Sequence, residues 1–312
     1  MKVIDNISLD MVNETRKVRD QFFKTISDYS TDLWNYCKYI TGSPWDGEDL
    51  YQETMIKSFG FLPQRWSEIT DKKYYLFKVA TNTWIDQCRK LKRETGILEE
   101  PCEMIEDFSS PLLLEEILTS LDSHLTPKQL AAFLLLDIFK FNAKEAAGIL
   151  QSTPGGVYSA VQRARRKIDS IDFTQSNSEI SNHKTKRTIQ LYLEAFNNGD
   201  LDGMLKLFSD HAQNEAYFGF QEFSKDEMIK GSLRYGLPGH TAREIILWNK
   251  PVIIVFANGE QGPEIHDIQL QEIENGKIVS HKSYFFRREF ILAAAKALGI
   301  KAQLEKPPVD WT

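Results

Sequence analysis

Residues 142–168 read NAKEAAGILQSTPGGVYSAVQRARRKI and contain two helix starts that are separated by a short polar turn. Asn142 followed by Glu145 is a start signal, because a short polar side chain caps the helix and a glutamate follows three residues later. Thr153 followed by Pro154 is a second start, since proline is favoured at the first helical position. Two short helices with this spacing form a helix-turn-helix, whose second helix can enter the major groove of DNA.

The second helix of this motif is predicted to have two different sides. Its inward side is apolar and comprises Val157, Ala160, Val161, Ala164 and Ile168. Its opposite side comprises Gly155, Ser159, Gln162, Arg163 and Arg166. Small residues allow close approach to a groove, Gln and Arg can read base edges, and further cations can bind phosphates. A helical hairpin with a solvated basic face is the alternative that the motif alone leaves open.

The charges of the chain are segregated, although their sum is only −6. Between Lys72 and Arg93 there are seven basic residues and one acid, whereas residues 94–122 contain nine acids and neither Lys nor Arg. A second basic cluster follows at residues 163–167. This pattern predicts two nucleic-acid contacts with a polyanionic segment between them.

Two segments upstream of the helix-turn-helix carry a resemblance to a known family. Residues 47–53, GEDLYQE, resemble the AEDLxQE signature of region 2 in the sigma-70 family. Residues 75–90, YLFKVATNTWIDQCRK, resemble the region 2 segment that binds the −10 promoter element. The helix-turn-helix is similar to region 4, which binds the −35 element. The chain therefore resembles an extracytoplasmic-function sigma factor, and this implies that it binds core RNA polymerase and directs promoter-specific transcription initiation.

The resemblance implies three sets of contact residues. An acidic helical face that docks on a basic coiled coil of the polymerase largest subunit is expected at Glu48, Asp49, Gln52 and Glu53. Contacts to the −10 element are expected at Lys78, Asn82, Trp84, Asp86, Arg89, Lys90 and Arg93. Contacts to the −35 element are expected at Thr153, Gly155, Ser159, Gln162, Arg163 and Arg166.

Opened DNA needs aromatic platforms beside cations, because unpaired bases stack on rings. Tyr74, Tyr75, Phe77 and Trp84 fit that description, although a place in the core is the alternative for most of them.

The predicted organisation is multidomain, with two all-α sigma domains followed by an α+β cone. Its parts are region 2 as a helical bundle (12–95), an acidic linker (96–117), region 4 (118–171), a second linker (172–183), the α+β domain (184–290), and a C-terminal helix and tail (291–312). In the family the first linker threads the polymerase channels. The expected partners are therefore promoter DNA and core RNA polymerase, contacted through its largest and second-largest subunits.

The C-terminal part changes from a helical to a strand-like pattern. Residues 184–208 predict helices broken at 198–200, and four strand-like runs follow between Glu244 and Arg287. Asn275-Gly276 is a hairpin signal between the last two runs. Helices followed by strands indicate an α+β domain, and this domain resembles the SnoaL-like cone fold, which is related to nuclear transport factor two.

The SnoaL resemblance implies an intramolecular contact with the sigma domains that modulates activity. The related group carries a Trp-Leu-Pro-Glu-Pro motif, of which Ile97–Pro101 keeps only part, and an Asp-Gly-Gly-Gly-Lys motif that is not found at Tyr217–Phe220. Residues that could line a pocket are His266, Asp267, His281 and Tyr284.

Catalysis, cofactors, metals and membranes are not expected. The three cysteines are far apart, and none forms a CxxC pair that would suggest a structural zinc. No apolar run is long enough to cross a membrane, and the N-terminus lacks a signal peptide, so a cytoplasmic protein is expected. Two alternatives stay open: a one-component DNA-binding regulator that senses a small molecule, and a cyclase- or isomerase-like enzyme fused to a DNA-binding module.

Overall fold

The structure is a computed structural model that describes residues 22, 24–61, 68–95, 118, 121, 124–168, 186–217, 220–232 and 239–305. The chain divides into two compact units, Met1–Ser178 and Glu179–Thr312. The predicted linkers at 96–117 and 172–183 lie outside the described residues, and so does the partial motif at Ile97–Pro101.

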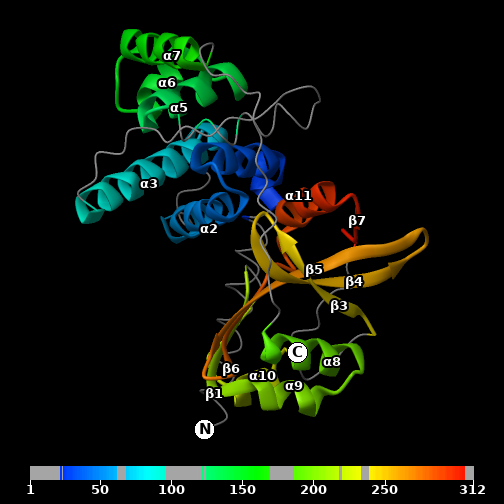
Figure 1. The fold of residues 1–312 in the computed structure, drawn as a ribbon. Helices are drawn as coiled ribbons and strands as arrows, with labels where there is room; N and C mark the ends of the chain where they lie inside the picture. The colour runs from blue at the N-terminus through cyan, green and yellow to red at the C-terminus, as the bar shows by residue number, and fades with distance from the viewer. Residues whose placement is uncertain are drawn as a thin grey trace. The chain divides into compact units, whose positions relative to one another are not determined.

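The first unit is helical throughout its described residues (Figure 1). A helix over residues 24–41 is followed by two long helices and then by a group of shorter ones. Their bounds are α2 (Pro44–Phe61), α3 (Lys72–Thr95), α5 (Pro127–Phe133), the π-helix η3 (Leu134–Ile138), α6 (Ala143–Ile149) and α7 (Pro154–Ile168).

The N-terminal helices pack around a fully buried apolar core. Its members are less than 2% exposed and include Leu33, Ile40, Leu50, Met55 and Leu76. The helix over 24–41 crosses α2 closely at Gly47, where an added Cβ would lie 2.5 Å from the Cα of Lys38. A larger residue at this position would therefore push the two backbones apart.

An aromatic cluster joins α3 to the helices of the helix-turn-helix part. Phe77 of α3 contacts Phe139 and Phe141, with ring centroids 5.3 and 5.0 Å apart. Tyr36 completes the cluster at 4.9 Å from Phe77 and 5.5 Å from Phe139. Two of these pairs are edge-to-face and two are tilted, and aromatic pairs of this kind stabilise beyond their buried area. The aromatic cluster is thus a shared core between the two helical parts of the first unit.

The short helices begin where the sequence predicts. The side chain of Asn142 accepts hydrogen bonds from the backbone amides of Lys144 and Glu145, and Glu145 accepts from the Asn142 amide at 2.8 Å. Proline occupies the first turn of both α5 and α7. The predicted helix-turn-helix is confirmed, with Gln151 in the turn at a φ of 49°.

The second unit combines helices with a mixed sheet (Figure 1). Its helices are α8 (Arg187–Asn197), α9 (Leu201–Leu207), α10 (Lys225–Lys230) and α11 (Arg288–Leu298). Its strands are β1 (Phe208–Ala216), β2 (Phe220–Glu222), β3 (Thr241–Leu247), β4 (Lys250–Gly259), β5 (Gly262–Glu274), β6 (Lys277–Ser283) and β7 (Lys301–Ala302).

The sheet runs in the order β2-β1-β6-β5-β4-β3, and β7 pairs with β5. β1 lies parallel to β6, while β3 to β6 form antiparallel neighbours. One face packs against α8 through a core that includes Tyr192, Phe196, Phe208, Ile253 and Ile278. The α+β prediction is confirmed: α8 packs on one face of the mixed sheet, and α11 contacts β3 and β5 as well.

Some predicted element boundaries in this unit are confirmed, and others are wrong. The helix break at 198–200 and the Asn275-Gly276 turn are confirmed, since both turn residues have positive φ values of 49° and 78°. The predicted tail is wrong at Lys301–Ala302, because these residues form β7 and pair with β5. The terminal helix is also not separate from the domain, since Phe290 of α11 is fully buried.

Among the described residues, no helix combines the length and apolar character that a membrane span requires.

Candidate nucleic-acid interface

The recognition helix α7 presents the predicted two sides. The inward residues Val157, Ala160, Val161 and Ala164 are all buried. The predicted contact residues are all exposed, namely Thr153, Gly155, Ser159, Gln162, Arg163 and Arg166. The two sides are thus confirmed, and the polar side is exposed to solvent, as the side of a helix that enters a DNA groove must be.

The N-terminus of α7 is capped by the side chain of Thr153, the residue directly before the helix. The hydroxyl of Thr153 accepts a hydrogen bond from the backbone N–H of Gly156 at 3.1 Å. This bond satisfies one of the free amides in the first turn. Thr153 therefore holds the helix start in place while its neighbours face outward.

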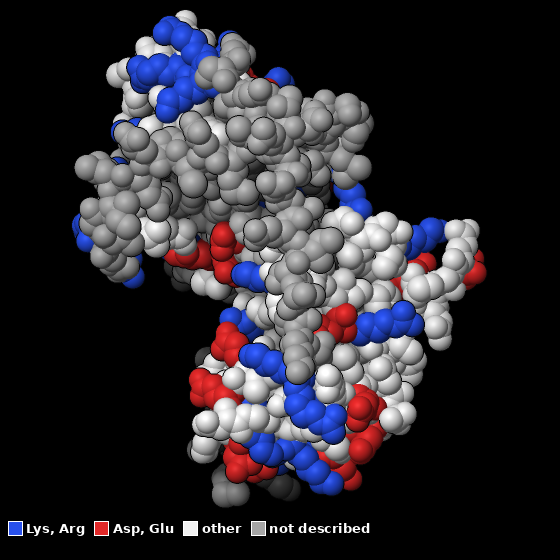
Figure 2. Space-filling view, in the orientation of Figure 1, with Lys and Arg blue, Asp and Glu red and all other residues white. Residues whose placement is uncertain are grey.

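The cations of α7 divide into two groups. Arg165 donates two hydrogen bonds to the carboxylate of Asp137, at 2.8 and 2.6 Å, which ties α7 to η3. Arg163 and Arg166 lie on the exposed side of the helix. Figure 2 shows Lys and Arg side chains gathered over the part of the first unit where Figure 1 draws α7. Arg165 thus holds α7 against η3, whereas Arg163 and Arg166 remain exposed.

The acidic face predicted on α2 is only half correct. Glu48 is fully buried, and its carboxylate accepts hydrogen bonds from Trp34 Nε1 at 2.8 Å and Gln52 Nε2 at 2.7 Å. Gln52 is buried as well. Placing both residues on the docking face was therefore wrong. The missed signal is their phase, since Trp45, Glu48, Gln52 and Met55 follow one another at spacings of three and four.

The exposed row of α2 consists of different residues. Asp46 and Asp49 are exposed, Glu53 is half-buried, and Ile56 is 66% exposed. These positions also repeat at three- and four-residue spacing, so they share one side of the helix. Asp49 and Glu53 belong to the predicted set, whereas Asp46 and Ile56 were missed by motif matching.

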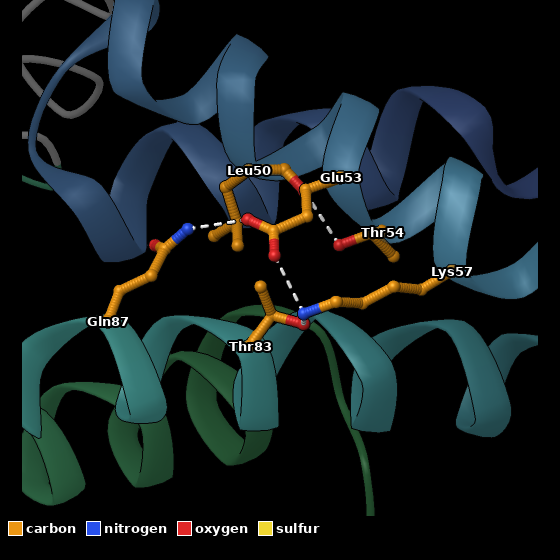
Figure 3. A network of polar contacts seen from close by, with 6 residues as sticks. All are labelled: Leu50, Glu53, Thr54, Lys57, Thr83 and Gln87. Atoms are coloured by element: carbon orange, nitrogen blue, oxygen red, sulfur yellow. Dashed lines mark hydrogen bonds and ion pairs between the residues drawn. The ribbon is translucent and has the colours of Figure 1, made fainter. Parts of the chain in front are cut away.

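Glu53 is held in a polar network between α2 and α3 (Figure 3). Its carboxylate pairs with Lys57 Nζ at 2.7 Å and accepts a hydrogen bond from Gln87 Nε2 at 2.7 Å. Lys57 also donates to the hydroxyl of Thr83 at 3.1 Å. The network fixes the orientation of Glu53, so that a partner would meet a pre-organised carboxylate.

Helix α3 differs from the prediction in the burial of its aromatic residues. Phe77 is fully buried and Trp84 is only 8% exposed, so neither ring is available as a platform for an unpaired base. The Trp84 assignment to the −10 contact is therefore wrong, and the core alternative is correct for both rings. Tyr74 and Tyr75 are half-buried, and burial raises the pKa of the Tyr75 phenol. Tyr74 also lies beneath the ammonium of Lys78, at 5.5 Å from the ring centroid.

The second half of α3 keeps the predicted polar surface. Asp86, Arg89, Lys90 and Arg93 are exposed, and Lys78 and Asn82 are half-buried. Arg89 pairs with Asp86 at 3.1 Å, and Arg93 Nε donates to the backbone carbonyl of Arg89 at 3.2 Å. These contacts line up cations along one side of the helix end, which suits binding to a polyanion.

Two of the pocket residues predicted in the second unit, Asp267 and His281, lie in one buried cluster, because the hydroxyl of Tyr192 donates to Gln269 at 3.1 Å and links their surroundings. The carboxylate of Asp267 accepts hydrogen bonds from the Ile268 amide, from Gln269 Nε2 and from Ser283 Oγ. His281 packs against the ring of Tyr192, and its burial lowers the pKa of the imidazole to about 4.

The other two predicted pocket residues are used in packing. His266 stacks on His240 with ring centroids 3.9 Å apart, and its Nδ1 donates to Gln303 Oε1 at 2.5 Å. Tyr284 stacks on Phe290 of α11 at 4.5 Å. Most of these contacts are packing contacts, and Nδ1 of His240, the ring on which His266 stacks, is buried without a hydrogen-bond partner. Among the described residues, no group of three or more His, Cys, Asp or Glu side chains could hold a metal ion.

Comparison with known proteins identifies both helical parts. Residues 25–94 match the family model of Sigma-70 region 2, and residues 115–168 match that of Sigma-70, region 4. These two segments of the chain are thus similar to regions 2 and 4 of sigma-70 factors. The region 2 match covers α2 and most of α3, and the region 4 match ends with the recognition helix α7.

Individual relatives are similar at low identity. The ECF RNA polymerase sigma factor SigG of Mycobacterium tuberculosis is 24% identical over 225 residues, covering 62% of this chain and 60% of SigG. The chain therefore spans about 60% of the length of that relative. SigM of Bacillus subtilis, another ECF sigma factor, is 26% identical over 148 residues, covering 46% of this chain and 90% of SigM. The crystal structure of M. tuberculosis SigJ aligns with a TM-score of 0.33 at 17% identity, covering 83% of this chain and 95% of SigJ.

Proposed function

We propose that this protein is a sigma factor of the extracytoplasmic-function type, which binds core RNA polymerase and directs initiation at specific promoters. The observation that supports this most is the pairing of two family regions in one chain, each with an exposed polar helix face. A regulator that only binds duplex DNA needs α7 but has no use for region 2.

The docking surface for core polymerase is proposed on the exposed row of α2. Asp49 and Glu53 supply negative charge, and Ile56 supplies an apolar anchor among them. Interfaces of this kind combine charge complementarity with a few buried apolar contacts. The partner surface is expected to be basic, in line with a coiled coil of the largest polymerase subunit, and the acidic linker is expected to reach the second-largest subunit.

Promoter DNA is proposed to contact two helices. The cations at the end of α3 are expected to hold the −10 element, with Asn82 and Arg89 among the contacts. The polar side of α7 is expected to hold the −35 element, with Arg163 and Arg166 on phosphates. The protein would act in the cytoplasm, where polymerase and DNA are found.

The second unit is proposed to modulate this activity without catalysis of its own. Its predicted pocket residues are engaged in packing and satisfied hydrogen bonds, which favours a role as a contact module. Because it is joined covalently to the sigma regions, even a weak intramolecular contact would act at a high effective concentration.

The proposal is tested by capture of core RNA polymerase on the purified chain, followed by run-off transcription. Asp49→Arg is expected to weaken capture at least fivefold, since a reversed charge in a docking row costs both attraction and specificity. Glu260→Arg, in the exposed turn between β4 and β5, is the matched charge control and should bind like the unaltered protein. Failure of the unaltered chain to bind core polymerase would contradict the proposal.

A further inference from the structure

Tyr158 is a large aromatic residue on the exposed side of the recognition helix. Its side chain is 57% exposed. It follows Gly155 by three residues and precedes Gln162 by four, so all three share the side of α7 that is turned away from the core. An added Cβ at Gly155 would meet nothing within 4 Å, so the groove side of the helix is open next to the ring.

The cations of α7 are confined to the C-terminal part of the helix. Residues 154–161, PGGVYSAV, contain no cation, and the cations begin at Arg163. Val157, Ala160 and Val161 of this segment are buried, and the hydroxyl of the preceding Thr153 caps the helix. The exposed residues of this half are Pro154, Gly155, Tyr158 and Ser159, and Tyr158 carries the only aromatic ring among them. The N-terminal residues of a recognition helix are the ones that meet base edges in the major groove.

A phenol ring at this position matches one feature of the major groove. Thymine carries a C5-methyl group, which is the apolar mark that distinguishes it there from the other bases. The edge of an aromatic ring packs on such a methyl group, while a tyrosine hydroxyl is among the groups that donate hydrogen bonds to phosphate oxygens. A cation at this place would favour guanine or phosphate instead.

We propose that Tyr158 is a specificity-determining residue of the −35 contact, which selects thymine at one base pair through its ring and binds the adjacent phosphate through its hydroxyl. The proposal rests on the function proposed above. It deepens that function by dividing α7 into a base-reading N-terminal half and a phosphate-binding C-terminal half.

The test uses the full chain with core RNA polymerase and linear DNA fragments that are randomised over both promoter elements. Fragments retained by the holoenzyme are sequenced for the unaltered protein and for Tyr158→Ala, Tyr158→Phe, Arg166→Ala and Phe223→Ala. Phe223 is also 57% exposed but lies in the second unit, so it controls for the loss of an exposed ring. The base preference in the −10 element serves as an internal reference in every sample.

Tyr158→Ala should lower the preference for thymine at one upstream base pair at least fivefold, which is in the range of one lost base contact. Tyr158→Phe should keep that preference. It should weaken binding to every fragment by about the same factor, because only the hydroxyl contact with the phosphate is lost. Arg166→Ala should weaken binding uniformly, and Phe223→Ala should change neither preference nor affinity. An unchanged upstream preference in Tyr158→Ala would overturn the proposal.

The sigma function and the role of Tyr158 can fail separately. Selection of fragments without core polymerase would contradict the proposed sigma function, yet the effect of Tyr158→Ala on base preference would still decide how α7 reads DNA. No selection by the unaltered holoenzyme would overturn both proposals. Circular dichroism of each variant checks that the exposed substitution leaves the helices intact.

Discussion

Helices α3 and α7 are both proposed to face DNA, but they are exposed to very different degrees. Every predicted contact residue of α7 is exposed, whereas α3 has Trp84 and Phe77 in the core and exposes its contact residues mainly in its second half. The two helices differ in exposure because different numbers of elements pack against them. Helix α7 packs on one side only, while α3 is covered by α2, by Tyr36 and by the phenylalanines that follow η3. Helical periodicity identifies one buried side reliably, but it fails where a helix is packed from several directions.

The strongest test of this difference is removal of a buried ring from α3. Phe77→Ala should lower the free energy of unfolding by about 3–5 kcal/mol, because a large cavity opens at the centre of the aromatic cluster. Urea unfolding measures this, with Arg163→Ala on the exposed side of α7 as the control that stays within about 0.5 kcal/mol. A fully stable Phe77→Ala protein with impaired transcription would restore the platform role for this ring.

The same contrast between buried and exposed polar positions holds for two histidines of the second unit. Burial lowers the pKa of His281 to about 4, below its ordinary value of 6.5, so the unfolded chain binds the proton first. Stability from this group is present above pH 6.5 and is lost as the pH falls towards 4, by on the order of 3 kcal/mol. His281→Gln should flatten the stability curve in this window, whereas His211→Gln, at an exposed position on β1, should leave it unchanged. Parallel curves for the two variants would count against the burial effect.

Adjacent acids of α2 should separate stability from binding. Glu48→Ala should cost about 1–3 kcal/mol of unfolding free energy, since the buried indole N–H of Trp34 and the amide of Gln52 lose their acceptor. Asp49→Ala should change stability by less than about 0.5 kcal/mol and should weaken capture of core polymerase. Thermal unfolding and polymerase capture are measured on both proteins, and equal effects of the two changes in both assays would remove the distinction.

The smallest effect should distinguish the arginines of α7. Arg163→Ala should reduce the slope of log affinity against log salt by about 0.9, the value for one lost phosphate contact. Arg165→Ala should leave that slope unchanged and should lower stability by about 0.5 kcal/mol, because Arg165 is paired with Asp137. Promoter binding by the holoenzyme over a range of salt concentrations checks both, and a reduced slope for Arg165→Ala would place this residue on DNA as well.

Much of the organisation was predictable because it depends on local signals. The capping residues of α6 and α7, the helix break near Gly199 and the Asn275-Gly276 turn all act within four residues of chain. β1 and β7 were not predicted, since β1 lacks a continuous apolar alternation and β7 exists only through its pairing with β5. The surroundings of the predicted pocket residues could not be derived from local signals either, because adjacent residues on one strand point to opposite faces of the sheet.

The amino-acid sequence by itself determined the order of the sigma regions, the helix starts and the two-sided character of α7. These depend on residue types at short, regular spacings, which act through capping and periodic burial. Only the tertiary structure decided that Trp84 is core and that Tyr158 stands exposed on the helix. The physical reason is that burial depends on how many partners a helix side meets, and those partners come from distant parts of the chain.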